Sequence, residues 1–190
     1  MQDNTVSNIR LNQVWATPIW EIDTRMTPQF NAALLEAFQR IKPSATGLTF
    51  NLFEHKNEPA IVMLEKVALE AAAKAFKQAG YARRVLGMRT GSVNTMKPGG
   101  WDTPHTHPHV MLAGVYYVKV PKGSGQLWLL DPRSEGTLWD SRVGMQVEPV
   151  EGKLVLFPGG VQHFVTQNNA DDIRVSVALN FTCTMGAAPE

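Results

Sequence analysis

The segment GGWDTPHTHPHVMLAGVYYV, residues 99–118, places three histidines within five positions of a chain that has only five in all. His105 and His107 are two residues apart, and alternate side chains of a β-strand share one face. On a strand, both imidazoles would therefore reach the same ion. A third histidine, His163, comes from a distant segment, and imidazole is a ligand for Fe, Zn, Cu or Ni. The sequence predicts a metal site formed by His105, His107 and His163.

Other residues of the region compete for places around this ion. His109 could replace His107, but Pro108 removes a backbone donor and tends to end strand pairing. We therefore expect His109 at the mouth of the site or behind its ligands. Asp102, in the turn before His105, and Asp131 are the nearby carboxylates that could serve as second ligand. Asp131 starts a loop, where it could equally cap a turn, and we rank both acids below His107.

The segments around these histidines read as a series of short strands separated by glycine and proline turns. GVYYVKV (114–120) and RVSVALNF (174–181) are apolar on both faces, as expected for a sheet that lies between a barrel interior and covering helices. This pattern predicts a jelly roll. The predicted strands span residues 84–96, 109–120, 126–130, 144–148, 153–157, 162–166 and 173–182.

The first part of the chain has a different pattern. A strand is predicted over residues 13–22. Thr27 is a predicted helix N-cap, because proline follows it at the first helical position, and the helix ends before Pro43. A short strand is predicted over residues 48–53.

A second helix is predicted from a cap at Asn57 to about Ala79. We expect a single α+β domain over residues 1–190, in which residues 1–82 cover a jelly-roll core formed by residues 83–185. The apolar stripe of the second helix is Ile61, Leu64, Ala68, Ala71 and Ala75.

The composition argues against several classes of protein. A net charge of +1 provides no basic footprint for nucleic acid. No apolar run approaches the roughly 18–20 residues of a membrane span, and the opening MQDNTVSNIR has no signal-peptide core. A single cysteine, Cys183, excludes an intramolecular disulfide and suits a reducing compartment. We expect a cytoplasmic protein with a small-molecule or protein side-chain substrate, and the sequence is compatible with a homodimer.

Two jelly-roll families resemble these motifs. GKLVLFPGGVQH (152–163) resembles the second conserved segment of the cupins, and GGWDTPHTH (99–107) resembles the start of the first. Cupins carry a glutamate four or five residues after the paired histidines, whereas this chain has Met111 and Leu112 there. The glycine expected further on is also missing.

The second resemblance is to the 2-oxoglutarate- and iron(II)-dependent oxygenases. VNTMKPGGWDTPHTH (93–107) and HFVTQNNADDIRVSVALNF (163–181) resemble the two halves of their pattern, in which an arginine or lysine follows the distal histidine. Arg174 lies eleven residues beyond His163. The chain is also similar, almost throughout, to a small group of these oxygenases known largely from bacteria and phages. The shared features are ATPIW, PHTHPHVMLAGVYYVKVP, SGQLWLLDPR, GKLVLFPGGVQH and RVSVALNF.

This resemblance implies a double-stranded β-helix that binds Fe(II) and 2-oxoglutarate, with ascorbate as a reductant. Arg174 would hold the distal carboxylate of 2-oxoglutarate together with Ser176, since a dicarboxylate in a barrel needs a permanently charged, bidentate partner. Asn94 or Tyr117 would add a hydrogen bond. His107 stands where the family usually has a carboxylate, which lowers the negative charge around the metal.

Two other functions stay open at this level. A three-histidine cupin metalloprotein, acting as a dioxygenase or isomerase, would need the same three ligands. A jelly-roll binding module without catalysis would need only a pocket. Trp101 and Trp128 lie near the expected mouth, where an aromatic side chain could contact substrate or simply pack.

Overall fold

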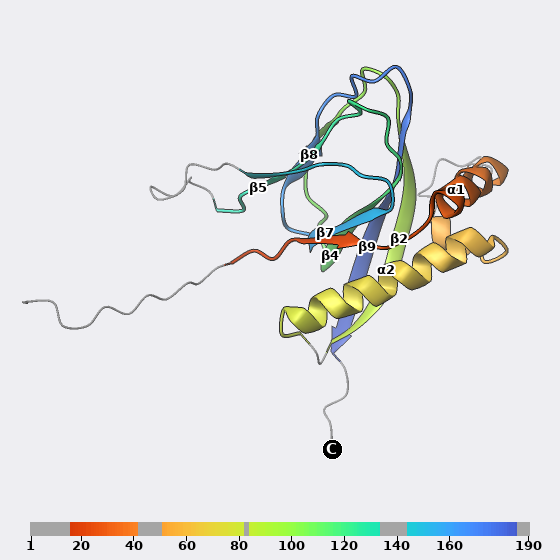
Figure 1. Cartoon of the computed structure of the whole chain (residues 1–190). Helices are drawn as coiled ribbons and strands as arrows, with labels where there is room; N and C mark the ends of the chain where they lie inside the picture. Colours follow the sequence, from red (N-terminus) through yellow and green to blue (C-terminus); the bar gives the residue numbers. More distant parts are fainter. Residues whose placement is uncertain (1–15, 42–50, 82–83, 134–143, 186–190) are drawn as a thin grey trace, which may run out of the picture.

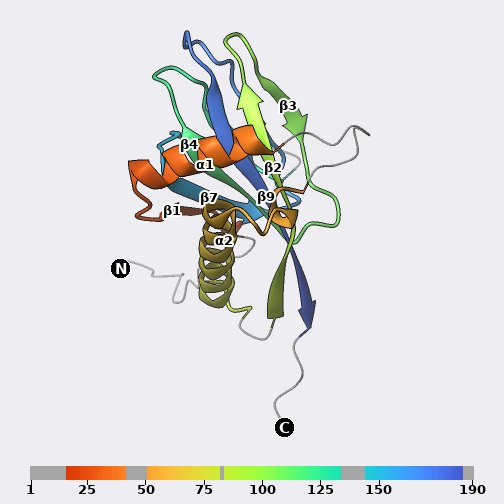
Figure 2. The ribbon, with the colours of Figure 1, turned by 90° about the vertical axis from the view of Figure 1, so that its right-hand side faces the viewer.

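The computed structural model describes residues 16–41, 51–81, 84–133 and 144–185, and these form two antiparallel sheets with two covering α-helices. The larger sheet has the strand order β1-β7-β4-β9-β2, and the smaller has the order β3-β8-β5-β6. Both helices lie on one side of the larger sheet, while β5 and β8 lie on its other side (Figures 1 and 2). The elements are β1 (Trp20–Asp23), α1 (Pro28–Arg40), the 3₁₀ helix η1 (Leu52–Glu54), α2 (Pro59–Gln78), β2 (Arg84–Met96), β3 (Asp102–His105), β4 (Leu112–Lys119), β5 (Leu127–Leu130), β6 (Gly144–Val147), β7 (Lys153–Pro158), β8 (His163–Val165) and β9 (Arg174–Met185).

The larger sheet is buried on both faces, as its apolar sequence predicts. Alternate residues such as Tyr116 and Val177 pack with the helices, and the residues between them, such as Tyr117 and Val155, pack with the smaller sheet. Tyr116 donates a hydrogen bond to Asn31 of α1 at 2.7 Å. The predicted double-stranded β-helix with two helices on its major sheet is confirmed.

The two helices begin at proline residues. Thr27 caps α1 as predicted, its hydroxyl accepting from the Phe30 N–H at 3.2 Å. The predicted Asn57 cap of α2 is wrong: the helix begins at Pro59, so Glu58 occupies the N-cap position without a side-chain cap hydrogen bond. Proline is favoured at the first helical position, and this fixes the start of the helix two residues beyond Asn57.

Glu58 has another role, because its carboxylate accepts two hydrogen bonds from Arg40 at the end of α1, at 2.8 and 3.1 Å. The ion pair joins the two helices, and it holds the pKa of Glu58 below its usual value.

Smaller differences concern the elements before β2. Within the predicted strand over 13–22, residues 13–15 lie outside the described residues, and β1 begins only at Trp20, beyond Pro18. The strand predicted over 48–53 is replaced at its end by η1, and residues 48–50 lie outside the described residues. In the apolar stripe predicted for α2, Ala71 is only partly buried, and the neighbouring Ala72 is buried instead. Among the described helices, the structure contains none with the length and apolarity that a bilayer crossing needs.

Candidate active site

The three predicted histidines lie at one end of a cavity of about 410 Å³ between the two sheets. His105 ends β3 and His163 begins β8, and these two residues are opposite each other in the antiparallel pair. His107 lies two residues beyond the end of β3, where its N–H donates to the Gly159 carbonyl at 2.9 Å. One ring nitrogen from each histidine lies within 4.8 Å of the other two.

The route by which His107 reaches this cluster differs from the prediction, which placed both histidines on one strand. The strand ends at His105, and a turn over residues 107–110 follows, with the Val110 N–H donating to the His107 carbonyl at 3.3 Å. Pro108 and a positive φ of 64° at His109 are typical of a type II turn. Proline therefore fixes the turn that presents His107 to the cavity.

Two of the imidazoles are oriented by backbone carbonyls. Nδ1 of His105 lies 2.7 Å from the Thr103 carbonyl, and Nδ1 of His163 lies 3.0 Å from the Val161 carbonyl. A carbonyl only accepts, so each Nδ1 carries the proton and each Nε2 keeps its lone pair. Such a backbone partner behind the ring is typical of metal-binding histidine.

The site also favours neutral imidazole. Burial lowers the pKa of His163 to about 4, and burial together with the neighbouring His105 lowers the pKa of His107. The ring of Phe157 contributes to this burial, because it packs edge-on against His163 at 4.7 Å between ring centroids. Neutral imidazole is the form that binds a metal, so both residues are ready as ligands at neutral pH.

The ring nitrogens have the spacing of ligands to a single ion. Nε2 of His107 lies 3.3 Å from Nε2 of His163. Two nitrogen ligands about 2.1 Å from one ion, at right angles to each other, lie about 3.0 Å apart. The three histidines therefore fit a facial metal site that leaves positions open toward the cavity.

The polar residues predicted for 2-oxoglutarate lie in one row across the larger sheet. Asn94 of β2 is opposite Ser176 of β9, which is in turn opposite Tyr117 of β4, so all three lie on the inner face. Arg174 lies two residues from Ser176 on the same face. Asn94, Arg174 and Ser176 line the cavity, and the ring of Tyr117 lies beneath the Arg174 guanidinium.

Arg174 is buried, with 2% of its surface exposed, and has free hydrogen-bonding capacity. Its Nε and Nη1 have no partner among the described residues, and neither has the hydroxyl of Tyr117. The guanidinium lies over the Tyr117 ring, 5.1 Å from the centroid. Burial lowers the pKa of Arg174 and raises that of Tyr117 to about 12. Buried unpaired donors beside a permanent positive charge fit a carboxylate that enters from the cavity.

The remaining predicted site residues are divided between the cavity and the surface. Trp101 lines the cavity and is 62% exposed at its rim. Asp102 also lines the cavity, but it lies on β3 rather than in a turn, and its carboxylate is not part of the metal-ligand cluster. Sequence reasoning missed this position because a four-residue strand containing Pro104 has a weak pattern.

Three predicted residues do not reach the cavity. His109 is exposed, and its carbonyl accepts from Arg89 at 3.1 Å. Asp131 caps the following turn and pairs with Arg133. Trp128 stacks on Phe164 on the outer face of the smaller sheet, opposite to the cavity-lining neighbours in its strand. A strand changes face at every residue, so one position along β5 decides whether a side chain reaches the site.

Comparison with known proteins agrees with this arrangement. Residues 93–180 match the model of a protein family described as "Putative 2OG-Fe(II) oxygenase". The matched segment begins in β2 and ends in β9, so it includes the three histidines and Arg174. No curated protein matches the sequence.

Solved structures with a similar fold include two prolyl hydroxylases and AviO1. A prolyl-4-hydroxylase from Pseudomonas putida has a TM-score of 0.59 at 19% identity, covering 87% of this chain and 88% of that one. A prolyl hydroxylase from Trichoplax adhaerens, solved with a peptide fragment of hypoxia inducible factor, has a TM-score of 0.61 at 15% identity, covering 86% and 83%. AviO1 from Streptomyces viridochromogenes has a TM-score of 0.62 at 14% identity, covering 91% and 93%.

These likenesses establish the fold, and the family match covers the segment that contains the cavity. Residues 93–180 are therefore similar to the 2OG-Fe(II) oxygenase family, and the described residues share the double-stranded β-helix fold with these solved structures.

Proposed function

We propose that this protein is an Fe(II)- and 2-oxoglutarate-dependent oxygenase of the hydroxylase type, in which His105, His107 and His163 hold the metal and Arg174 binds the distal carboxylate of 2-oxoglutarate. The observation that carries the assignment is the buried guanidinium of Arg174, with Nε and Nη1 unpaired among the described residues, in the same cavity as three clustered histidines. A metal site alone would not need that cation. The family match over residues 93–180 supports both parts of the site.

When bound, iron and 2-oxoglutarate supply the oxidative chemistry of this family: dioxygen and 2-oxoglutarate give succinate, carbon dioxide and one oxygen atom for the substrate. The protein contributes position and charge. The backbone carbonyls of Thr103 and Val161 keep Nδ1 of His105 and His163 protonated, so that Nε2 faces the metal.

The residues proposed to bind 2-oxoglutarate are held in place by the larger sheet. Arg174 lies on Tyr117, and both residues are anchored in central strands of the larger sheet. The Arg174 donors, the Tyr117 hydroxyl and the Ser176 hydroxyl would receive the distal carboxylate, and Asn94 could add an amide hydrogen bond. Burial of Arg174 and Tyr117 excludes water, which strengthens a charge-assisted hydrogen bond.

The three-histidine ligand set distinguishes this site from the usual one with a carboxylate. Three neutral ligands leave the full charge of a divalent ion in the cavity, so the two carboxylates of 2-oxoglutarate would be attracted strongly. Asp102, which lines the same cavity, is the carboxylate nearest in sequence to this ligand set and would offset part of the charge from outside it.

The direct test is binding of 2-oxoglutarate to the Fe(II) form under anaerobic conditions, followed by calorimetry or by the metal-to-ligand absorption band. We expect binding that depends on Fe(II), and slow formation of succinate when oxygen and ascorbate are added. A cupin isomerase or a binding module would bind the metal or a ligand without this dependence. Absence of 2-oxoglutarate binding to the Fe(II) form would reject the assignment.

We further propose a small molecule or a protein side chain as primary substrate and the cytoplasm as the working compartment. The near-neutral net charge, which argues against a nucleic-acid substrate, supports the first proposal, and the single cysteine supports the second. A homodimer and the use of ascorbate as reductant stay predictions.

A further inference from the structure

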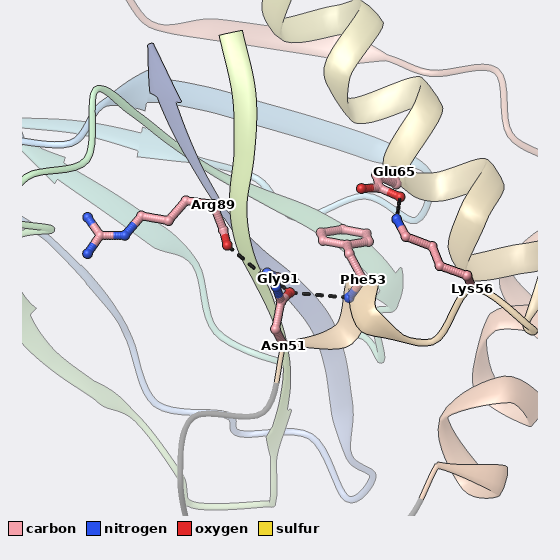
Figure 3. Close-up of polar contacts among 6 residues, drawn as sticks. All are labelled: Asn51, Phe53, Lys56, Glu65, Arg89 and Gly91. Carbon is pink, nitrogen blue, oxygen red and sulfur yellow. Dashed lines mark hydrogen bonds and ion pairs between the residues drawn. The ribbon is translucent and has the colours of Figure 1, made fainter. Parts of the chain in front are cut away.

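Strand β2 forms one edge of the larger sheet, and the cavity opens beside it. An edge strand presents backbone N–H and C=O groups that no neighbouring strand satisfies. In β2, Asn51 satisfies part of this edge: its Oδ1 accepts from the Gly91 N–H at 3.1 Å, and its Nδ2 donates to the Arg89 carbonyl at 3.4 Å (Figure 3).

Asn51 is held in this position by η1. Its Oδ1 also accepts from the Phe53 N–H at 3.2 Å, and an ion pair between Lys56 and Glu65 ties the following residues to α2 (Figure 3). The Phe53 ring lies so close to β2 that a β-carbon at Gly91 would come within 2.2 Å of it. At Gly91, the side chain of Asn51 therefore accepts the hydrogen bond that a neighbouring strand would otherwise accept.

Beyond Gly91, this edge of β2 has no partner among the residues that the structure describes. On an antiparallel strand, residues with both backbone groups directed at the partner alternate with residues whose groups point away. Since the Gly91 N–H points away from β9, the backbone groups of Val93 and Thr95 do so too. Within the described part of the chain, neither residue has a hydrogen bond on this edge. Val-Asn-Thr carries no charge that would repel an added strand.

Both faces of this open edge carry a cavity. The candidate active site, about 410 Å³, lies on the inner face and is lined by Val93, Asn94 and Thr95. A second cavity of about 600 Å³ lies toward α1 and is lined by Val93 and Thr95 again. Its other apolar lining residues are Leu35, Phe38, Ile41, Leu52, Ile173 and Val175.

We propose that the primary substrate is an extended polypeptide segment that pairs antiparallel with β2 at Val93 and Thr95. This inference rests on the proposed function and specifies its substrate class. Strand addition combines main-chain hydrogen bonds with pockets for alternate side chains, and this edge offers both. Continuity of the two cavities through the shared residues Val93 and Thr95 favours one occupant that fills both.

The register follows from strand geometry. The peptide residue opposite Asn94 directs its side chain into the active-site cavity, toward the histidines. Its two neighbours, opposite Val93 and Thr95, direct theirs into the second cavity. The modified residue is therefore flanked on both sides by apolar residues such as leucine.

Hydrogen exchange tests the pairing without any turnover. The probe is a capped peptide Ser-Ser-Leu-Xaa-Leu-Ser-Ser amide, in which Xaa is an equal mixture of the common amino acids. We expect the amides of Val93 and Thr95 to exchange freely in the Fe(II) and 2-oxoglutarate complex and to become protected when the peptide is added. The amide of Asn94, which points toward β9, is the internal control and stays protected throughout. Protection of Val93 and Thr95 before peptide is added would mean that this chain itself occupies the edge, and would overturn the proposal.

Matched peptides separate the contribution of the leucine side chains from that of the main-chain hydrogen bonds. Replacing both leucines by serine should weaken binding by about ten-fold or more, because the apolar cavity loses its contacts. N-methylation of both leucines removes the two donors that face β2 and should cost roughly ten-fold. N-methylation at the central residue, whose N–H points away from β2, is the control. Equal effects of the two methylations would overturn the proposed pairing.

A protein variant gives an independent test. Proline is tolerated on an edge strand where its nitrogen faces outward, so Thr95→Pro removes an outward N–H without breaking the ladder with β9. We expect Thr95→Pro to bind the leucine peptide about ten-fold more weakly than Thr95→Val, which keeps the outward N–H, while the two variants bind 2-oxoglutarate with similar affinity. Equal peptide affinity in Thr95→Pro and wild type would refute strand addition. Because 2-oxoglutarate binding is measured separately, failure of the peptide inference is distinguishable from failure of the oxygenase assignment. If Thr95→Pro does not fold, the methylated peptides on the wild-type protein decide.

Discussion

Replacing Arg174 by methionine should abolish tight 2-oxoglutarate binding and at the same time stabilise the protein without ligand. The guanidinium is 2% exposed, and its Nε and Nη1 have no partner in the described part of the chain. A buried charge without a partner destabilises the folded state, since its hydration is lost and nothing replaces it. Methionine fills a similar volume and adds no unpaired donor.

The loss of 2-oxoglutarate affinity and the gain in stability of the ligand-free protein differ in size. Truncating one partner of a buried, charge-assisted pair costs about 2–5 kcal/mol, so 2-oxoglutarate affinity should fall by roughly 30-fold or more. The contact of Arg174 with the Tyr117 ring offsets part of the cost of the buried charge, by about 0.5–2 kcal/mol. We therefore expect a gain of only about 1 kcal/mol in the free energy of unfolding, or about 2–4 °C in Tm for a domain of this size.

The assay compares thermal unfolding with and without 2-oxoglutarate for wild type, Arg174→Met and Arg174→Lys. The Tm of the wild type should rise when 2-oxoglutarate is added. Arg174→Met should have a higher Tm without ligand, and 2-oxoglutarate should not raise it further. Arg174→Lys should recover part of the response, because it keeps the charge but not the fork of donors. Lys97→Met is the matched control: it removes a positive charge from an exposed residue that lines the same cavity, and should change neither value.

A lower Tm for Arg174→Met would contradict this reasoning, because it would mean that the guanidinium stabilises the fold. Unchanged 2-oxoglutarate affinity in the same variant would place the cosubstrate elsewhere. A functional residue that lacks a partner is expected to show the combination of lost binding and gained stability.

Three further predictions concern the histidines. His163→Ala should lower Fe(II) affinity by more than about 100-fold, since even groups behind metal ligands contribute about 10–100-fold; anaerobic titration against the exposed control His109→Ala checks this, and equal affinities would reject His163 as a ligand. His107→Asp restores a hard carboxylate ligand and should shift selectivity from Zn toward Fe(II) in a competition experiment, whereas an unchanged ratio would mean that His107 is not bound to the metal. In the metal-free protein, burial lowers the pKa of His163 from 6.5 to about 4, so the unfolded state takes up the proton first as the pH falls. Stability should be complete above about pH 6.5 and fall toward pH 4 by up to about 3 kcal/mol, and a urea titration of His163→Gln should show a flatter pH dependence than wild type.

Several features of the protein follow from local sequence alone. Thr27 followed by proline sets the start of α1, because the cap and the fixed φ act within one turn. The strands GVYYVKV and RVSVALNF are recognisable because apolar residues on both faces are needed wherever a sheet has a covered side and a core side. The three histidines and Arg174 are conspicuous because such residues are rare within apolar β-segments.

Other features depend on contacts between distant residues. Nothing near His107 in sequence reveals that it lies beyond the end of β3 and is held by the Gly159 carbonyl, because that contact joins residues 52 positions apart. Trp128 faces outward while its neighbours face the cavity, and a strand with apolar residues at every position carries no sign of which face is which. Among the described residues, the edge at Val93 and Thr95 is open because the order of strands gives β2 one neighbour and the contacts of Asn51 end at Gly91. Local propensity acts over a few residues, so it defines the helices, the strands and the candidate metal ligands. The pairing of strands across the whole chain decides which side chains share a cavity and which edge is left for a partner.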